Sequence, residues 1–318
     1  MMNLPKLTDI DVKNKRVLLR LDLDIKEFNE NDLRLKASNK TLDYLKENSC
    51  QITIIAHRGR PDGEDPSLSL KIFEPYFSRW NAKVEENLRF DKGEEENNPD
   101  FSKKLSLLGD VFINDSFGNS HRNHASIIGV PKLLPSAFGF RFIEEVETLS
   151  KEFQKPTFLV ISGIKEDKVE MAKKLSTIVD KVLVGGRLPE YFGDEGRESI
   201  RLQNSDRKLL IGNLLQDKED ITLNTIDRFK EELASAGTII LAGALGKYED
   251  EGHTQGTKEI FNFVSKTNAF KIAGGGDTEI CLQKYNLVDK FDWVSVGGGA
   301  MLQFLVTKTL PGIEALLN

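Results

Sequence analysis

Short apolar runs alternate with stretches of helical periodicity along nearly the whole chain, and this alternation limits the possible folds more than any other feature. The apolar runs predict a strand that begins at Arg16 and further strands at 51–55, 82–84, 111–113, 159–161, 181–184, 208–211, 238–242, 270–273 and 293–296. Helices are predicted between them, at 38–46, 68–80, 101–108, 143–153, 166–178, 223–236, 255–265, 277–285 and 300–305. Such alternation favours an α/β fold with doubly wound, mostly parallel sheets of the Rossmann-like type.

Length and composition indicate two domains of a cytoplasmic protein. The chain has 318 residues, of which 39% are hydrophobic, enough for two separate cores. Pro156, just past a predicted helix and before an apolar strand, marks a domain junction. The mean hydropathy is −0.35, no apolar run is long enough to cross a membrane, and the first residues lack the apolar core of a signal peptide.

Charge and cysteine content exclude several classes of protein. The net charge is −6, so we expect no binding of nucleic acid. Only Cys50 and Cys281 are present, far apart and without ligand residues at metal spacing. This pattern argues against a disulfide scaffold and against structural zinc, and it favours a reducing compartment.

Cationic side chains follow four successive strands predicted in the first half. They are Arg20, then His57 and Arg60, then Arg89, then His121, Arg122 and His124, with Arg34 in addition. Because parallel strands bring their carboxyl ends to one edge, we expect these groups to converge, with a dense cationic tip at 121–124. A single arginine at a strand end is usually exposed or in an internal salt bridge, but the repetition favours a phosphorylated, anionic small molecule. The acidic run 94–100 between them is interpreted as a solvated loop.

Glycines follow the strands of the second half. Gly185-Gly186, Gly243, Gly274-Gly275-Gly276 and Gly297-Gly298-Gly299 lie where strands end, and the last two groups open helices. Backbone N–H groups at such turns bind phosphate, so the set favours a nucleotide or another phosphate ligand, although neither a Walker loop nor a G-x-G-x-x-G pattern is present. Asp277 is either a magnesium ligand or a helix N-cap. Lys165 and Lys168 either neutralise phosphates or form a solvated first helical turn.

These stretches together resemble the phosphoglycerate kinase family over nearly the whole chain. The matching segments are 16–22, 57–61, 86–90, 114–126, 274–278, 297–300 and 310–312. The resemblance implies two lobes joined by a hinge. It places a phosphoglycerate-binding lobe at 1–142, an interdomain helix and hinge at 143–156, a nucleotide-binding lobe at 157–305 and a returning tail at 306–318. It also implies reversible phosphoryl transfer between 1,3-bisphosphoglycerate and ADP, giving 3-phosphoglycerate and MgATP, by a monomeric enzyme of glycolysis.

The resemblance also implies a role for each matching residue. The implied substrate-binding set is Arg20, Asp22, Asp24, Arg34, His57, Arg60, Arg89, His121, Arg122 and His124. The implied catalytic set is Arg34, Lys168, Gly276 and Gly299, with Arg34 steadying the phosphoryl group in transfer. The implied nucleotide-binding set is Lys165, Lys168, Gly185, Gly186, Gly243, Glu249, Gly274, Gly275, Gly276, Asp277 and Thr278, with Mg²⁺ at Asp277 and the ribose at Glu249.

The chain departs from the family pattern in several places. A long piece is missing between Trp80 and Leu88, and the region 186–225, which builds much of the family's adenine pocket, is contracted. Asp24 and Ala242 stand where the family has asparagine. Two alternatives therefore stay open beside the kinase. One is a weakened or inactive relative that binds phosphoglycerate or a protein partner, and the other is a kinase for another small carboxylic acid.

Overall fold

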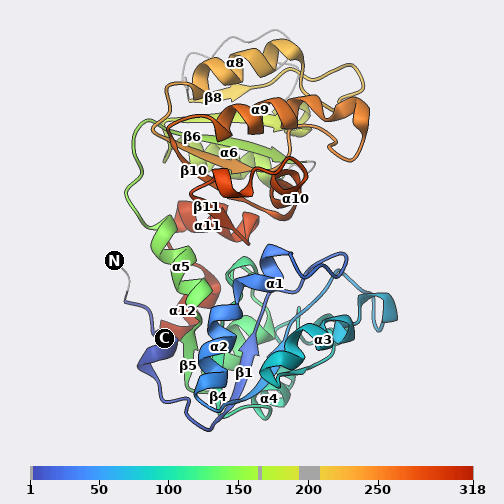
Figure 1. Ribbon diagram of the computed structural model, residues 1–318, viewed down its shortest axis with the longest axis vertical. Helices are drawn as coiled ribbons and strands as arrows, with labels where there is room; N and C mark the ends of the chain where they lie inside the picture. The colour runs from blue at the N-terminus through green and yellow to red at the C-terminus, as the bar shows by residue number, and fades with distance from the viewer. Residues whose placement is uncertain (1–2, 164–166, 193–207, 318) are drawn as a thin grey trace. The chain divides into compact units, whose positions relative to one another are not determined.

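The computed structural model describes residues 3–163, 167–192 and 208–317, and these form two compact units (Figure 1). One unit comprises Met1–Ser150 with Thr307–Asn318, and the other comprises Lys151–Val306. Each contains a parallel sheet with helices, so the α/β class predicted from the sequence is confirmed. Of the predicted site residues, Lys165 lies outside the described residues.

The first unit is built on a sheet whose described strands follow the order β3-β2-β1-β4-β5, all parallel. The strands are β1 (Arg16–Arg20), β2 (Gln51–Ile55), β3 (Lys83–Val84), β4 (Val111–Asn114) and β5 (Ser136–Phe138). The helices are α1 (Leu33–Ala37), α2 (Asn39–Glu47), α3 (Glu74–Phe77), α4 (Pro99–Ser106), α5 (Phe140–Leu149) and α12 (Pro311–Leu317). The strand order reverses direction between β1 and β4, where open α/β sheets bind ligands.

Both faces of this sheet are buried, because successive side chains of a strand point to opposite faces. Val17 and Leu19 of β1 pack in one apolar core with Leu42 of α2. Leu18 packs in a second core with Phe101 of α4. The unbroken apolar runs of the sequence are therefore strands covered by helices on both sides, as the doubly wound arrangement requires.

The second unit contains the larger sheet, whose described strands follow the order β11-β10-β9-β6-β7-β8. The strands are β6 (Thr157–Gly163), β7 (Lys181–Gly186), β8 (Leu209–Ile211), β9 (Thr238–Ala242), β10 (Phe270–Gly274) and β11 (Trp293–Ser295). The helices are α6 (Asp167–Ser176), α8 (Leu223–Leu233), α9 (Gln255–Ser265), α10 (Gly276–Lys284) and α11 (Gly298–Thr307). Here the order reverses between β6 and β9, so this is the second expected ligand position.

Two local predictions were wrong. The helix predicted at 68–80 is broken into a 3-10 turn (Leu70–Phe73), the four-residue α3 and another 3-10 turn (Ser78–Trp80). Pro75 lacks an N–H group, so a continuous helix across it is disfavoured, although the apolar side chains of the segment are still buried. The strand β5 was missed because its three residues are too short to give a periodic signal.

The C-terminal residues belong to the first unit. Gly312 at the start of α12 donates its N–H to Ser120 O at 2.9 Å, next to the loop that carries His121. A Cβ at Gly312 would lie 2.8 Å from Ser120 Cβ, so the close approach of this helix requires glycine.

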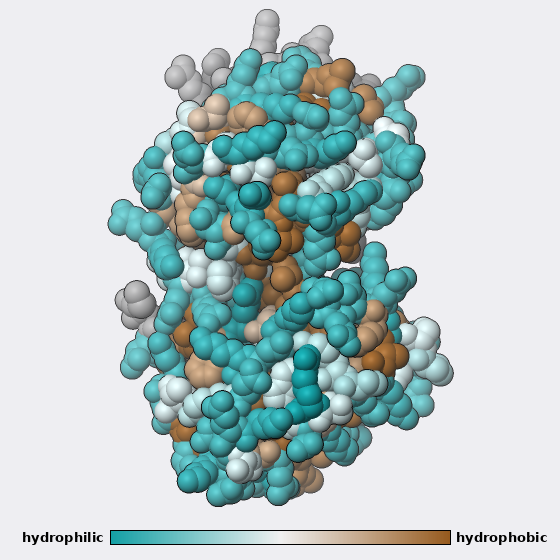
Figure 2. Space-filling view, viewed as in Figure 1, coloured by the Kyte–Doolittle hydropathy of each residue, from teal (hydrophilic) through white to brown (hydrophobic). Residues whose placement is uncertain are grey.

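Polar residues predominate on the face of each unit that Figure 2 shows, with smaller apolar patches between them. Cys50 and Cys281 are both free. Within residues 3–163, 167–192 and 208–317, no single helix has both the length and the apolar character needed to span a membrane. The pair α11 and α12, taken as one broken span, passes that test by length and composition only.

Candidate functional site

The strand ends of the first unit bring the predicted cations together. Arg20, the last residue of β1, stands in register with Ile55 at the end of β2 and with Asn114 at the end of β4. His57 comes shortly after β2, and Arg89 lies in the 3-10 turn Leu88–Phe90 after β3. These groups therefore gather at the carboxyl edge of the sheet, around the point where the strand order reverses.

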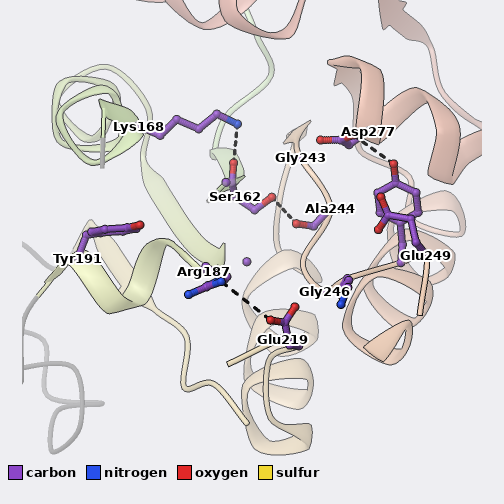
Figure 3. A pocket seen from close by; sticks show the side chains of 14 residues that line it. Ser162, Lys168, Arg187, Tyr191, Glu219, Gly243, Ala244, Gly246, Glu249 and Asp277 are labelled. Carbon is purple, nitrogen blue, oxygen red and sulfur yellow. Dashed lines mark hydrogen bonds and ion pairs between the residues drawn. The ribbon is translucent and has the colours of Figure 1, made fainter. Parts of the chain in front are cut away.

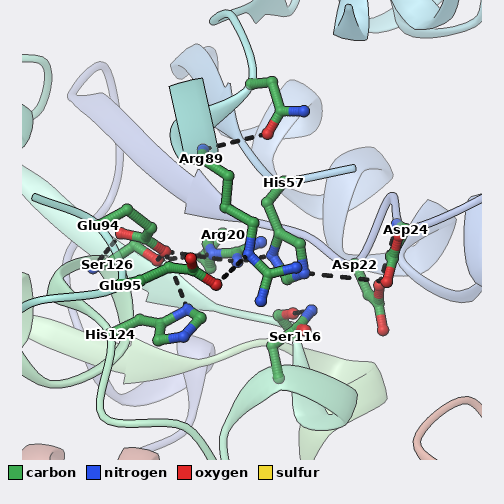
Figure 4. A network of polar contacts seen from close by, with 12 residues as sticks. Arg20, Asp22, Asp24, His57, Arg89, Glu94, Glu95, Ser116, His124 and Ser126 are labelled. Carbon is green, nitrogen blue, oxygen red and sulfur yellow. Dashed lines mark hydrogen bonds and ion pairs between the residues drawn. The ribbon is translucent and has the colours of Figure 1, made fainter. Parts of the chain in front are cut away.

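Arg20 is fully buried and is held at each nitrogen (Figure 4). Its Nε donates to Ser126 Oγ at 2.9 Å, its Nη2 donates to His57 Nδ1 at 2.8 Å, and its Nη1 donates to Leu21 O. Burial lowers the pKa of this guanidinium, while the nearby Glu94 carboxylate raises it. Arg20 is thus a fixed charge beneath the site.

Glu94 is also fully buried, so the interpretation of 94–100 as a solvated loop is wrong at this residue, whereas Glu95 and Glu96 are exposed. Its carboxylate accepts hydrogen bonds from Ser126 N at 2.9 Å and Ser126 Oγ at 2.6 Å (Figure 4). Its Oε1 lies 3.8 Å from Arg20 Nη2 and 3.6 Å from His124 Nδ1. Burial alone would raise the pKa of Glu94, but His124 and Arg20 hold it below its ordinary value. Glu94 is therefore an ionised counter-charge within the cationic cluster.

Two of the predicted cations are neutral histidines, which corrects the expectation of a dense cationic tip at 121–124. Burial and the charge of Arg20 hold the pKa of His57 well below its ordinary value. Burial and the charge of Arg122 lower the pKa of His121 to about 4. Because Arg20 can only donate, His57 Nδ1 is an acceptor and its proton lies on Nε2. The positive charge of the site therefore comes mainly from the arginines.

Arg34 and Asp24 lie on adjoining segments of the same unit. The Asp32 carboxylate caps α1 by accepting from Arg34 N at 2.9 Å, which fixes the start of the helix that carries Arg34. Arg34 Nη1 donates to Asp24 O at 2.6 Å. Asp24 Oδ1 accepts from Gly59 N at 2.8 Å, and its Oδ2 lies 4.0 Å from His57 Nε2. The chain near Asp24 thus connects the Arg34 side chain to the cluster around His57.

Several buried donors of the cluster have no hydrogen-bond partner among the described residues. They are Arg89 Nη2, Arg122 Nε and His57 Nε2. Arg60 is exposed, and Asp22 is buried and accepts from Asp24 N at 3.2 Å. A buried donor without a partner is costly, so donors of this kind are suited to an oxygen-rich anion that supplies acceptors when it binds.

Asn87 positions this cluster, although it was not predicted as a site residue from the sequence. Its Oδ1 accepts from Arg58 N at 3.2 Å and from Arg89 N at 3.1 Å, and its Nδ2 donates to Arg58 O at 2.7 Å. This buried amide joins the segment after β2 to the turn that carries Arg89. The only sequence signal is its place before a short apolar turn, where asparagine is a common cap.

The second unit contains a pocket of about 760 Å³ at the carboxyl ends of β6, β7 and β9 (Figure 3). Five predicted nucleotide-binding residues line it, namely Lys168, Gly186, Gly243, Glu249 and Asp277. Its volume is in the range of small-molecule and cofactor sites. It lies at the position where the strand order of this sheet reverses, as expected for a ligand site in such a fold.

The pocket also contains residues that the sequence interpretation missed. They are Arg187, Tyr191, Glu219, Lys247 and Tyr248. Arg187 Nη1 lies 3.9 Å from Glu219 Oε1, so two of these charges are paired (Figure 3). None of them stands in a recognisable motif, and several fall in the contracted region, so no sequence signal marked them.

Glycine is required at two turns of this unit. Gly243 has φ +119°, and a Cβ there would lie 2.2 Å from Ser162 Oγ. Gly275 has φ +110° directly before α10, and a Cβ on Gly298 would lie 2.7 Å from its Cα. The loops that open α10 and α11 therefore approach each other at their glycines.

The remaining predicted residues do not line this pocket. They are Gly185, Gly274, Gly275, Gly276, Thr278 and Gly299. Thr278 Oγ1 accepts from Gly243 N at 2.8 Å and donates to Gly274 O at 3.1 Å, so its hydroxyl holds two of the loops together. The binding roles of these residues stay predictions.

Lys168 and Asp277 place opposite charges on the pocket wall. Lys168 Nζ donates to Ser162 O at 2.7 Å (Figure 3). Asp277 lies in the first turn of α10, whose N-cap is Gly275, so Asp277 is not the N-cap of this helix. A cation and a helix N-terminus suit phosphate oxygens, and a carboxylate beside them suits a divalent cation.

The site fits Mg²⁺ through a single side chain. Among the described residues, no group of three or more histidine, cysteine, aspartate or glutamate side chains could hold a metal ion. Mg²⁺ in nucleotide sites is commonly held by one or two carboxylates together with phosphate oxygens and water. Asp277 supplies the one carboxylate that this arrangement needs.

Fold and sites together define an α/β protein with a cationic cluster in one unit and a nucleotide-sized pocket in the other. The family model described as phosphoglycerate kinase matches residues 7–85, 81–217 and 216–308. Successive matched segments join at residues 81–85 and 216–217, and both junctions lie in the regions where this chain is shorter than the family pattern. The chain belongs to the phosphoglycerate kinase family.

Individual relatives agree with this assignment. The phosphoglycerate kinase of Finegoldia magna is 33% identical over 392 aligned positions, covering 99% of both chains, and that of Coprothermobacter proteolyticus is 32% identical over 390, again covering 99% of both. Since this chain has only 318 residues, many aligned positions have no counterpart in it. The solved structure of phosphoglycerate kinase from Coxiella burnetii is similar with a TM-score of 0.79, at 28% identity over 99% of each chain.

Proposed function

We propose that this chain catalyses reversible phosphoryl transfer between 1,3-bisphosphoglycerate and ADP, giving 3-phosphoglycerate and MgATP, a step of glycolysis. The observation that carries the proposal is the set of buried, unpartnered donors on Arg89, Arg122 and His57 at the ligand edge of the first unit. Membership of the phosphoglycerate kinase family supports it. The acceptor in this reaction is a carboxyl group, so the enzyme is a phosphotransferase.

The first unit would hold the phosphoglycerate. Arg89, Arg122 and exposed Arg60 supply charge for phosphate and carboxylate oxygens, since a guanidinium matches two oxygens at once. Fixed Arg20 adds charge from beneath, and His57 offers its Nε2–H as a neutral donor. Of the other residues in the implied substrate set, His121, His124 and Asp22 border this cluster, and Asp24 joins it to Arg34.

The second unit would hold the nucleotide. Lys168 and the N-terminus of α10 would bind its phosphates, and Glu249 would bind the ribose. Mg²⁺, held at Asp277 and by the nucleotide phosphates, would neutralise charge on the group being transferred. Arg34, Lys168, Gly276 and Gly299 would stabilise that group in transfer, which depends on alignment and charge rather than on a covalent intermediate.

A coupled assay with 3-phosphoglycerate, ATP and Mg²⁺ tests the proposal directly. We expect turnover by the wild-type protein and a fall in kcat of roughly 100-fold or more in Arg34→Ala, because a guanidinium acting on transferred charge contributes several kcal/mol. Lys36→Ala is the matched control on the same helix, since Lys36 Nζ donates to Asn31 Oδ1 at 2.7 Å on an exposed part of the unit. Undetectable turnover by the folded wild-type protein would contradict the proposal.

We further propose that the enzyme acts as a cytoplasmic monomer without nucleic acid or membrane partners. The two free cysteines support a reducing compartment, and the net charge of −6 supports the absence of nucleic-acid partners. Sedimentation of the purified protein measures the oligomeric state.

A further inference from the structure

The loop after β9 is fastened to α10 by three hydrogen bonds. Gly243 N donates to Thr278 Oγ1 at 2.8 Å, Tyr248 Oη donates to Asp277 Oδ1 at 3.1 Å, and Lys284 Nζ donates to Tyr248 O at 2.6 Å. Figure 3 marks the hydrogen bond to Asp277 by a dashed line. Tyr248 takes part in two of the three, one through its hydroxyl and one through its backbone.

Tyr248 is anchored as firmly as a core residue while it lines the pocket. The residue is 7% exposed, and it packs in the apolar core of the second unit with Cys281 and Leu282 of α10. The donor therefore has a fixed position and a fixed direction.

The hydrogen bond from Tyr248 orients the carboxylate of Asp277. Its Oδ1 is engaged by the Tyr248 hydroxyl, whereas its Oδ2 has no hydrogen-bond partner in the described part of the chain. A carboxylate held at one oxygen is oriented to give the other to a ligand, which is how partners outside the coordination sphere orient metal ligands. The next residue along the loop, Glu249, lines the same pocket.

We propose that Tyr248 is a positioning residue for the metal-bound nucleotide. Its hydroxyl holds the Asp277 carboxylate so that one oxygen faces the cation. Its backbone, bound to Lys284, fixes the position of the neighbouring Glu249 relative to α10. This inference rests on the proposed function, because it assumes that Asp277 meets a divalent cation bound with the nucleotide. A purely structural tyrosine would satisfy its own buried hydroxyl and leave the metal dependence of binding unaffected.

Tyr248→Phe removes the hydroxyl and keeps the ring. Calorimetric titration with ADP, with and without Mg²⁺, separates metal-dependent binding from binding of the nucleotide alone. We expect the Kd for ADP in the presence of Mg²⁺ to rise about 10-fold, since loss of such an outer partner commonly costs 10- to 100-fold in metal affinity. The Kd for ADP without Mg²⁺ should stay within about 2-fold of wild type, because the ring and the loop remain in place.

Tyr285→Phe is the matched control. Tyr285 comes directly after α10, and its buried hydroxyl has no hydrogen-bond partner among the described residues, so its removal should change neither Kd. In an Asp277→Asn background, Tyr248→Phe should have no further effect on the Mg²⁺ dependence, because the charge it orients is gone. Thermal unfolding of each variant establishes that it is folded.

Two results would overturn the inference. One is an unchanged Kd for Mg²⁺-ADP in folded Tyr248→Phe. The other is an equal loss of affinity with and without Mg²⁺, which would assign the hydroxyl to the shape of the pocket. No binding of ADP by the wild-type protein under any condition would refute the proposed function itself, and with it the metal-bound nucleotide on which Tyr248 is proposed to act.

Discussion

Replacing Glu94 by glutamine tests whether the buried carboxylate balances the cationic cluster. Both carboxylate oxygens accept from Ser126, and Oε1 lies 3.8 Å from the Arg20 guanidinium, with neither side chain exposed. The glutamine side chain keeps one acceptor oxygen, but its NH₂ group replaces the other and faces donors of Ser126 or Arg20. The substitution also removes the negative charge. Removing one partner of a buried ion pair costs about 3–5 kcal/mol.

We therefore expect Glu94→Gln to lower the unfolding free energy of the first unit by about 3–5 kcal/mol. For a unit of this size each kcal/mol moves the unfolding midpoint by about 2–4 °C. The midpoint measured by circular dichroism at neutral pH should therefore fall by roughly 10 °C. Glu96→Gln is the matched control two residues away, where an exposed side chain should change stability by less than about 0.5 kcal/mol.

The pH dependence gives a second check on the same reasoning. The pKa of Glu94 is held below its ordinary value in the folded protein, so its stabilisation is present above the unfolded pKa and is lost as the pH falls through the folded pKa. The difference between wild type and Glu94→Gln should thus shrink in acid. Equal stability of the two proteins at neutral pH would refute the assignment of Glu94 as a necessary counter-charge.

Three further outcomes are expected from the geometry. Gly243→Ala should cost about 1–3 kcal/mol of unfolding free energy and weaken ADP binding, because its Cβ would lie 2.2 Å from Ser162 Oγ at a φ of +119°. Gly63→Ala, at a φ of +96° but with no atom within 4 Å of the added Cβ, should keep ADP binding. Because the pKa of His121 is about 4 in the free protein and an anion favours its protonated form, 3-phosphoglycerate should bind with proton uptake at pH values just above about 4. Calorimetry in buffers of different ionisation enthalpy measures that uptake, and His121→Gln should reduce it. The pKa of His253 is raised by hydrogen bonds to Asp217 and Asp250, so its stabilising effect is full below the unfolded pKa and is lost as the pH rises through the folded value. His253→Gln should flatten the dependence of the unfolding midpoint on pH above about 6, and an unchanged profile would contradict this.

The sheets could be predicted from the sequence because their strands are buried on both faces. Such strands are continuous apolar runs, as at Val111–Asn114, and the topology of a parallel sheet brings the residues after each run to one edge. The ligand edge of both units was therefore predictable, since Arg20, His57 and Gly243 all stand where strands end. The break at Pro75 was not foreseen because the apolar spacing around it is that of a helix.

The burial, charge state and hydrogen bonds of the site residues depend on contacts between segments that are distant in the sequence. No local sequence pattern predicts such contacts. Glu94 is the first of three adjacent glutamates, and only its contact with Ser126 makes it the buried one. The neutral state of His57 and His121 results from burial beside arginines, which the sequence cannot show because it gives the residues without their depth. The bond from Tyr248 to Asp277 likewise joins residues of different elements.

The most direct measurement is calorimetric titration of the wild-type protein with 3-phosphoglycerate and, separately, with ADP and Mg²⁺. If one chain holds an anion site in its first unit and a nucleotide site in its second, each titration should fit one site per chain. Arg122→Gln should then weaken only the first, and Lys168→Gln only the second. Binding of 3-phosphoglycerate without any binding of nucleotide would contradict the account.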